Sequence, residues 1–234
     1  MSIEHNLKKV VNLENSSHNK LNPKLHTLIR LCGHNFSKMA KKLKFTKPFD
    51  NNFTQVMKDT GIECMDYLNC SLCYVGSDEI TYWIKPFTQN QIDNGSELPF
   101  SGRIQKIVSL LAGKVSTVFT LKLGKLIGWD ELTNISPHFD CRIWQVDTFD
   151  QVVGNLKERI DWVSSNSKMI QVQHYISHKE LNGFGTNGAN DYINPTDANN
   201  PIEKLKKEKG IIFDENVSLD NSLGTLTYLI KTTK

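Results

Sequence analysis

The chain has little that would direct it into a membrane or out of the cell. We find no apolar run in its 234 residues that we expect to span a bilayer, which would take about 20 mostly apolar residues. The first segment, Met1–Pro23, is polar and lacks the apolar core of a signal peptide. These absences argue against membrane and secreted classes, and we expect a cytoplasmic protein.

Cysteine is scarce and shows no pairing pattern. Five cysteines, an odd number in a chain without an export signal, favour reduced thiols. Cys70 and Cys73 have metal-like spacing, but no second Cys/His pair follows at zinc-finger distance, so we interpret both as core residues. The net charge of +3 permits an anionic partner without requiring one. Lysines cluster in 38–47 and 204–209, which is also typical of solvated helix faces.

A predicted hairpin organises the rest of the chain. Asn69–Tyr74 and Ile80–Ile84 have the apolar, aromatic and β-branched residues of strands, and Gly76-Ser77 supplies the turn between them. Two further strands flank the hairpin in sequence: Lys24–Leu31, which ends at Cys32-Gly33, and Phe139–Val146.

Helical spacing fills the intervals between these strands. We expect a short basic helix through about Lys44, a helix to about Tyr67 capped by Asp50 or Asn51, and a polar loop at 86–99. The later helices are a long one capped by Ser101, with an apolar stripe from Ile104 to Val118, and one capped by Asp147 or Thr148.

This order of elements predicts an α/β (α+β) fold. Strand, helix, two hairpin strands, helix and strand form the split β-α-β sheet of a ferredoxin-like palm core, an antiparallel sheet with helices on one face. We divide the chain into a polar lead-in (1–23), the palm-like core (24–150) and a C-terminal part (151–234) that completes the same domain. That part adds helical and strand segments and contains a loop, 182–201, that we expect to be mobile.

The predicted topology brings one set of polar residues together. In a split β-α-β sheet the end of the first strand lies beside the tip of the central hairpin, so Cys32-Gly33 should lie near Ser77-Asp78-Glu79. Backbone N–H groups of Gly33–Phe36 are suited to a triphosphate, and carboxylates are suited to Mg²⁺. The basic candidates to neutralise a triphosphate are Lys38, Lys47 and Arg103. A solvated turn is the alternative interpretation of the hairpin tip.

At this point the sequence resembles a known family, the tRNA-histidine guanylyltransferases and their 3′-to-5′ polymerase-like tRNA repair relatives. The matching stretches run in the family's order: Arg30-Leu31-Cys32-Gly33-His34-Asn35-Phe36, Lys47-Pro48-Phe49-Asp50, Gly76-Ser77-Asp78-Glu79, Pro99-Phe100-Ser101-Gly102-Arg103-Ile104-Gln105-Lys106-Ile107-Val108-Ser109, Phe139-Asp140-Cys141-Arg142, Ser177-His178-Lys179-Glu180-Leu181 and Gly224-Thr225. The first and third are the most specific.

The resemblance implies an enzyme that activates a tRNA 5′-phosphate with ATP or GTP and adds a nucleotide, GTP, to the 5′ end by two-Mg²⁺ catalysis. It implies catalytic roles for Asp78, Glu79, Lys47 and Asp50. It also implies a homodimer or homotetramer. The metal positions that it implies are Asp78, the carbonyl of Gly33, and Cys32. The nucleotide-binding positions that it implies are Cys32, Gly33, His34, Asn35, Phe36, Ser37, Ser77, Asp78 and Arg103.

Cys32 departs from the family, which has a metal-bridging aspartate there. A thiol is mostly protonated near neutral pH and is a soft ligand, poorly suited to Mg²⁺. Three hypotheses follow: a divergent active nucleotidyltransferase, with Mn²⁺ as a softer alternative ion; a non-catalytic protein that binds tRNA or nucleotide; and a palm-type nucleotide cyclase. A cyclase would form a cyclic product without RNA.

Overall fold

The computed structural model describes residues 19–47, 50–175 and 230–231. Its sheet has five strands in the order β4-β1-β3-β2-β5, and all neighbours are antiparallel. The strands are β1 (His26–Gly33), β2 (Leu72–Gly76), β3 (Glu79–Ile84), β4 (Phe139–Val146) and β5 (Ile230–Lys231). The first four have the order of a ferredoxin-like sheet, so the predicted fold is confirmed.

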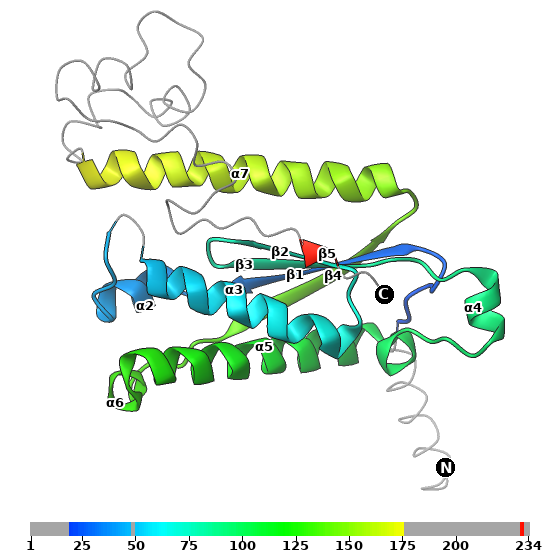
Figure 1. Ribbon diagram of the computed structural model, residues 1–234, viewed down its shortest axis with the longest axis horizontal. Coiled ribbons are helices and arrows are strands. Elements are labelled where there is room, and N and C mark those ends of the chain that lie inside the picture. Colours follow the sequence, from blue (N-terminus) through cyan, green and yellow to red (C-terminus); the bar gives the residue numbers. More distant parts are fainter. Residues whose placement is uncertain (1–18, 48–49, 176–229, 232–234) are drawn as a thin grey trace, which may run out of the picture.

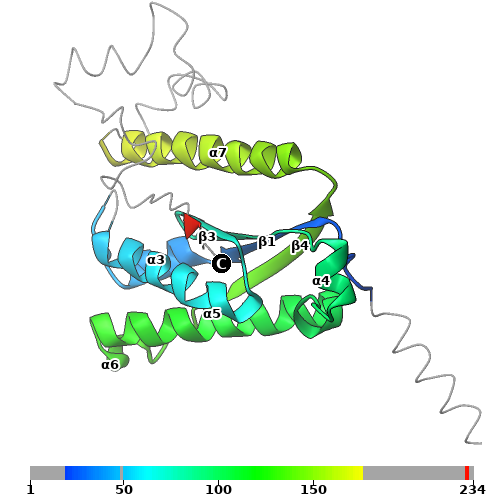
Figure 2. The same cartoon turned by 45° about the vertical axis from the view of Figure 1, so that its right-hand side comes forward.

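Helices cover the sheet on two sides (Figures 1 and 2). The helices α3 (Asn51–Met65) and α5 (Ile104–Ile127) lie against one face, and α7 (Phe149–Tyr175) lies across the other. The shorter helical segments are α2 (Phe36–Lys42), η1 (Asp66–Leu68), α4 (Gln89–Asp93), η2 (Pro99–Gly102) and α6 (Trp129–Leu132). The palm therefore has its two core helices on one face, as expected, and its C-terminal helix on the opposite face.

Each face of the sheet has its own apolar core. The core between the sheet and the helices α3 and α5 is the larger of the two, and it includes Leu31, Ile80 and Tyr82. The face toward α7 is a smaller cluster in which Leu28 of β1 and Tyr74 of β2 pack with residues of α7. Successive side chains of a strand point to opposite faces, which is why β1 feeds both clusters.

Local chemistry explains how α3 starts and packs. Asp50 accepts hydrogen bonds from the N–H groups of Phe53 and Thr46, both at 3.0 Å, so of the two predicted caps, Asp50 and Asn51, it is Asp50 that caps the helix. Inside the helix, a Cβ on Gly61 would lie 2.7 Å from the Val75 side chain. Glycine therefore lets α3 approach β2 closely.

The long helix α5 differs from its prediction at its start. It begins at Ile104, after Arg103, and Ser101 does not cap it. The Ser101 hydroxyl instead donates to Glu97 at 3.1 Å, and its φ of 54° is left-handed. The helix continues to Ile127, and among the described residues it alone is long and apolar enough, by length and composition, to cross a membrane. The expectation that no run reaches that length was therefore wrong.

Other boundaries agree in part. The expected loop at 86–99 contains the short helix α4, so the loop prediction was wrong there. A capping box between Thr88 and Gln91 stabilises the start of this helix. Thr148 accepts the N–H of Gln151 at the start of α7, as expected for a cap. The predicted loop 182–201 lies outside the described residues. Residues 19–23 of the predicted lead-in include the buried Leu21, whose N–H donates to Gly102.

Candidate functional site

The end of β1 and the tip of the β2–β3 hairpin are joined directly. The N–H of Gly33 donates to the carbonyl of Asp78 at 2.9 Å. Cys32 lies opposite Glu79 of β3 on one side and opposite Asp140 of β4 on the other. The predicted approach of Cys32-Gly33 to Ser77-Asp78-Glu79 is confirmed, and Asp140 joins the same row on three adjacent strands.

The hairpin tip is a tight, partly buried turn. Ser77 has a left-handed φ of 56°, and a Cβ on Gly76 would meet the Tyr74 hydroxyl at 2.5 Å. Burial raises the pKa of Asp78 above its ordinary value; its own backbone and the Ser77 hydroxyl oppose this shift through hydrogen bonds, and Glu79 adds to it. Asp78 is thus a carboxylate that would gain from a cation or a proton.

Cys32 stands where the family's aspartate would be, and its surroundings keep it neutral. Burial raises the pKa of its thiol to about 11, with further contributions from the negative charges of Glu79 and Asp140. Near neutral pH the side chain is therefore a thiol, not a thiolate. A thiol offers no negative charge and no hard oxygen to a magnesium ion.

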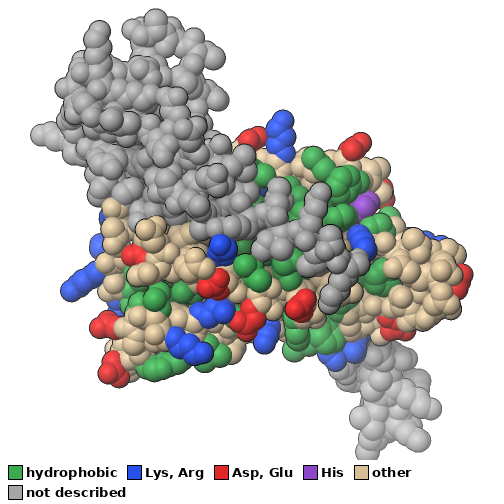
Figure 3. Space-filling view, in the orientation of Figure 1, with side chains coloured by type: hydrophobic (Ala, Val, Ile, Leu, Met, Phe, Trp, Pro, Cys, Tyr) green, Lys and Arg blue, Asp and Glu red, His purple; other side chains and the backbone are tan. Residues whose placement is uncertain are grey.

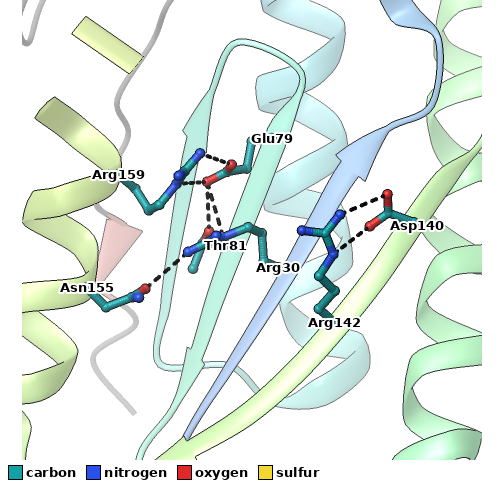
Figure 4. A network of polar contacts seen from close by, with 7 residues as sticks. All are labelled: Arg30, Glu79, Thr81, Asp140, Arg142, Asn155 and Arg159. Carbon is teal, nitrogen blue, oxygen red and sulfur yellow. Dashed lines mark hydrogen bonds and ion pairs between the residues drawn. The ribbon is translucent and has the colours of Figure 1, made fainter. Parts of the chain in front are cut away.

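Glu79 is not a free carboxylate (Figure 4). Only 4% of the residue is exposed. Arg159 of α7 donates to both of its oxygens, through Nε at 3.0 Å and Nη2 at 2.6 Å, and Arg30 of β1 contacts Oε1 at 3.4 Å. Burial alone lowers the pKa of Arg159, but its hydrogen bond and charge interaction with Glu79 raise it above the ordinary value. The carboxylate is thus neutralised by protein cations.

The predicted triphosphate cradle at 32–37 has a rigid base. Phe36 is buried in the core and packs against the rings of Phe53, Phe119 and Phe139. A Cβ on Gly33 would lie 2.5 Å from the Phe36 ring, so only glycine fits there. The N–H of His34 is already bonded to the carbonyl of His138 at 2.9 Å. The first turn of α2 follows next in the chain, and its N-cap Asn35 has a left-handed φ of 58°. The N–H groups of Lys38 and Met39 already donate to the Asn35 carbonyl, so those of Phe36 and Ser37 are the ones that precede the first intrahelical bonds.

Other predicted site residues are more scattered. Lys38 and Lys47 are exposed, and both oxygens of Asp50 are engaged by the backbone of its own segment. Arg103 precedes α5 beside Asn19 and Lys20, near the start of β1. It lies at the opposite end of the sheet from Cys32, roughly 25 Å away by the length of an eight-residue strand. The structure therefore does not bring Arg103 to the cradle within one chain.

A cavity of about 280 Å³ also lies at that far end of the sheet, beside the last residue of β3, Ile84. Its lining includes Tyr67, Phe87 and Phe100. On the face seen in Figure 3, Lys and Arg side chains are interspersed with acidic ones over the described part of the surface, so that face has no single basic patch. The second predicted lysine cluster, 204–209, lies outside the described residues.

The oxygen donors at the site do not fit a pair of Mg²⁺ ions. Asp78 and the carbonyl of Gly33 remain suitable, but Cys32 is a thiol and Glu79 is held by two arginines. Within residues 19–47, 50–175 and 230–231, no three His, Cys, Asp or Glu side chains are grouped so that they could hold a metal ion. The two-ion arrangement that the resemblance implied therefore lacks its ligands here.

Sequence reasoning did not identify the two arginines that hold Glu79. Arg159 lies 80 residues from Glu79 in sequence, so no local pattern joins them. One signal was present: Arg159 follows Val152 and Leu156 and precedes Val163 at helical spacing, and these three apolar residues are buried. A charged residue within such a stripe predicts a buried partner.

A split β-α-β sheet with acidic residues at the hairpin tip beside the first strand defines a palm-type domain. Residues 7–147 match the family model described as tRNAHis guanylyltransferase. That match covers more than half of the chain, which therefore belongs to the tRNA-histidine guanylyltransferase family.

Solved structures share the fold, and one curated protein is similar in sequence. A bacterial tRNA(His) guanylyltransferase-like protein, solved in complex with ATP, superposes with a TM-score of 0.71 at 24% identity, covering 90% of this chain and 81% of that chain. The Saccharomyces cerevisiae tRNA(His) guanylyltransferase superposes with a TM-score of 0.61 at 20% identity, covering 93% and 92%. An uncharacterized protein of Acanthamoeba polyphaga mimivirus is 25% identical over 213 residues, 86% of this chain, and the match spans 66% of that protein's length.

Proposed function

We propose that this protein is a nucleotidyltransferase that binds a nucleoside triphosphate and adds a guanine nucleotide to the 5′ end of a tRNA, in the 3′-to-5′ direction. The observation that carries the proposal is the hydrogen bond from Gly33 to Asp78. It holds the family's two most specific motifs in contact at one end of the sheet. Membership in the family supports transfer chemistry on tRNA, and similar bacterial structures hold ATP and GTP.

The chain's own residues have distinct tasks in this proposal. We expect Asp78 and the Gly33 carbonyl to be the oxygen donors nearest the triphosphate, and the left-handed Ser77 shapes the turn that carries Asp78. The first turn of α2 offers N–H groups to phosphate oxygens, and Lys38 and Lys47 supply positive charge from exposed positions. We route no step through a pair of metal ions, because Cys32 and Glu79 are not available to hold them.

A second candidate has its own supporting observation. Because Glu79 is neutralised by Arg159 and Arg30 and Cys32 is uncharged, the site has lost two of the carboxylate charges that family chemistry uses. A protein that binds tRNA or nucleotide without transferring it fits this arrangement.

One assay separates the two candidates. Incubation of 5′-monophosphorylated or 5′-truncated tRNA with labelled GTP and ATP, in Mg²⁺ and separately in Mn²⁺, is run on the wild type, Cys32→Asp and Cys32→Ser. The serine variant controls for loss of the thiol without gain of a carboxylate. We expect the wild type to incorporate label and Cys32→Asp to incorporate more.

The other outcomes are informative as well. Label only with Cys32→Asp, together with tRNA binding by the wild type, would favour the binding protein. No label with any variant or ion, from folded protein, would overturn the proposed transfer.

A further inference from the structure

Arg159 occupies an unusual position on α7. Val152, Leu156 and Val163, at the same helical spacing, form the buried stripe by which α7 rests on the sheet. Arg159 falls inside this stripe, and its side chain is only 15% exposed. Its guanidinium also lies over the ring of Trp162, 4.5 Å from the ring centre. A charge in such a contact is costly unless it is paired with good geometry.

Glu79 pairs with Arg159 in such a geometry (Figure 4). The side chain of Glu79 is 6% exposed, and its two oxygens each receive one N–H of Arg159 in the bidentate geometry typical of strong arginine–carboxylate pairs. Arg30 adds a second contact to Glu79, at 3.4 Å, and reaches Asn155 of α7 with its other end, also at 3.4 Å. Thr81 donates to the same carboxylate at 3.5 Å. The cluster therefore ties α7 to β1 and β3.

This cluster lies at the end of the sheet that carries the candidate site. Glu79 is in register with Cys32 and directly follows Asp78 in the chain. A metal ion bound by Glu79 would need a carboxylate oxygen that Arg159 now occupies. One carboxylate cannot serve the guanidinium and a metal ion fully at the same time.

We propose that Arg159 is a positioning residue that fixes α7 over the site end of the sheet through Glu79, and that this pairing withholds Glu79 from divalent cations. The inference rests on the placement of the proposed site but not on its activity. Cation affinity at the site is then set by a helix residue outside the family's sequence motifs, and α7 and a divalent cation compete for the same carboxylate.

The test measures Mn²⁺ binding to the full chain, without nucleotide, by the loss of the free-ion electron paramagnetic resonance signal. The variants are Arg159→Met, which keeps side-chain length without charge, and Arg159→Met with Glu79→Gln. Lys157→Met is the matched control, since Lys157 is exposed on the same helix. We expect Arg159→Met to bind Mn²⁺ about tenfold more tightly than the wild type, because it removes a competing positive charge, and one nearby charge changes the cation affinity of a carboxylate by about tenfold or more. The added Glu79→Gln should abolish this gain, and Lys157→Met should match the wild type.

Amide hydrogen exchange gives the second readout. Exchange over residues 152–163 should be faster in Arg159→Met and unchanged in Lys157→Met. Arg159→Lys, which keeps the charge but loses the bidentate geometry, should show intermediate Mn²⁺ affinity and gives a reading if the methionine variant does not fold.

An unchanged Mn²⁺ affinity in a folded Arg159 variant would overturn the proposal, even if α7 exchanges faster, because a purely structural role predicts that result. Nucleotide transfer is measured in neither arm, so failure of the proposed function leaves the outcome of this test unaffected.

Discussion

The two faces of the sheet use the same strands for different purposes. Toward α3 and α5, β1 presents Ile29 and Leu31, both fully buried among apolar neighbours. Toward α7 it presents Leu28, then Arg30, then Cys32, so that this face becomes polar as it approaches the hairpin tip. A face that only stabilises the fold has no need of such a gradient. Buried charge on the α7 face therefore marks the end of the sheet that carries the candidate site.

A large effect is expected on the apolar face, comparable with the loss of a buried charge partner. Leu31→Ala should lower the free energy of unfolding by about 2–5 kcal/mol, because it removes buried methyl groups and leaves a cavity. Chemical denaturation of this variant measures the loss, with Leu126→Ala, at an exposed position of α5, as the control. Binding of GTP by the folded fraction should be unchanged. A loss of GTP affinity at Leu31→Ala would show that the two faces are not independent.

A smaller effect of opposite sign is expected at the hairpin tip. Burial raises the pKa of Asp78 in the folded state above the ordinary value of 3.8. The folded state therefore holds the proton more tightly than the unfolded state, and Asp78 lowers stability progressively as pH rises from about 3.8 through the raised pKa. Asp78→Asn removes this penalty. The variant should melt at a higher temperature than the wild type at neutral pH, and the difference should vanish below about pH 3.8.

The matched control for this measurement is Asp161→Asn, since Asp161 is exposed on α7. Both variants are melted in EDTA, so that no divalent cation binds Asp78. A difference between Asp78→Asn and the wild type that stays constant from acid to neutral pH would contradict the ionisation argument.

The contrast between the faces also separates what the sequence could predict from what it could not. The span of β4, Phe139–Val146, was predicted to the residue, and the approach of Gly33 to Asp78 followed from strand order alone. Both depend on local patterns and on the few topologies open to a split β-α-β sheet. The start of α5 was misplaced, because Ser101 adopts a left-handed conformation that its residue type does not favour.

The cluster of Arg30, Glu79 and Arg159 is the part of the site that the sequence could not predict. Glu79 was selected correctly as a residue of the site end, but its pairing with Arg159 depends on where α7 docks. The position of α7 depends on tertiary packing, and the sequence of the hairpin does not indicate it. The distance of Arg103 from the cradle has the same origin, because it depends on the direction in which α5 crosses the sheet.

The smallest expected effect is at the open edge of the α7 face. Arg142 contacts Asp140 of the same strand at 3.4 Å, but their side chains are 64% and 48% exposed, so water screens the pair. Arg142→Met should therefore cost less than about 1 kcal/mol, against about 3–5 kcal/mol for the loss of one partner of a buried pair such as Arg159 and Glu79. Denaturation at low and high salt measures the difference, and the small cost at Arg142 should disappear at high salt because exposed charges are screened. Equal losses of unfolding free energy for Arg142→Met and Arg159→Met would mean that burial does not determine how much each charge pair on this face stabilises the fold. The Arg159–Glu79 pair would then be no more important for holding α7 in place than the exposed Arg142–Asp140 pair.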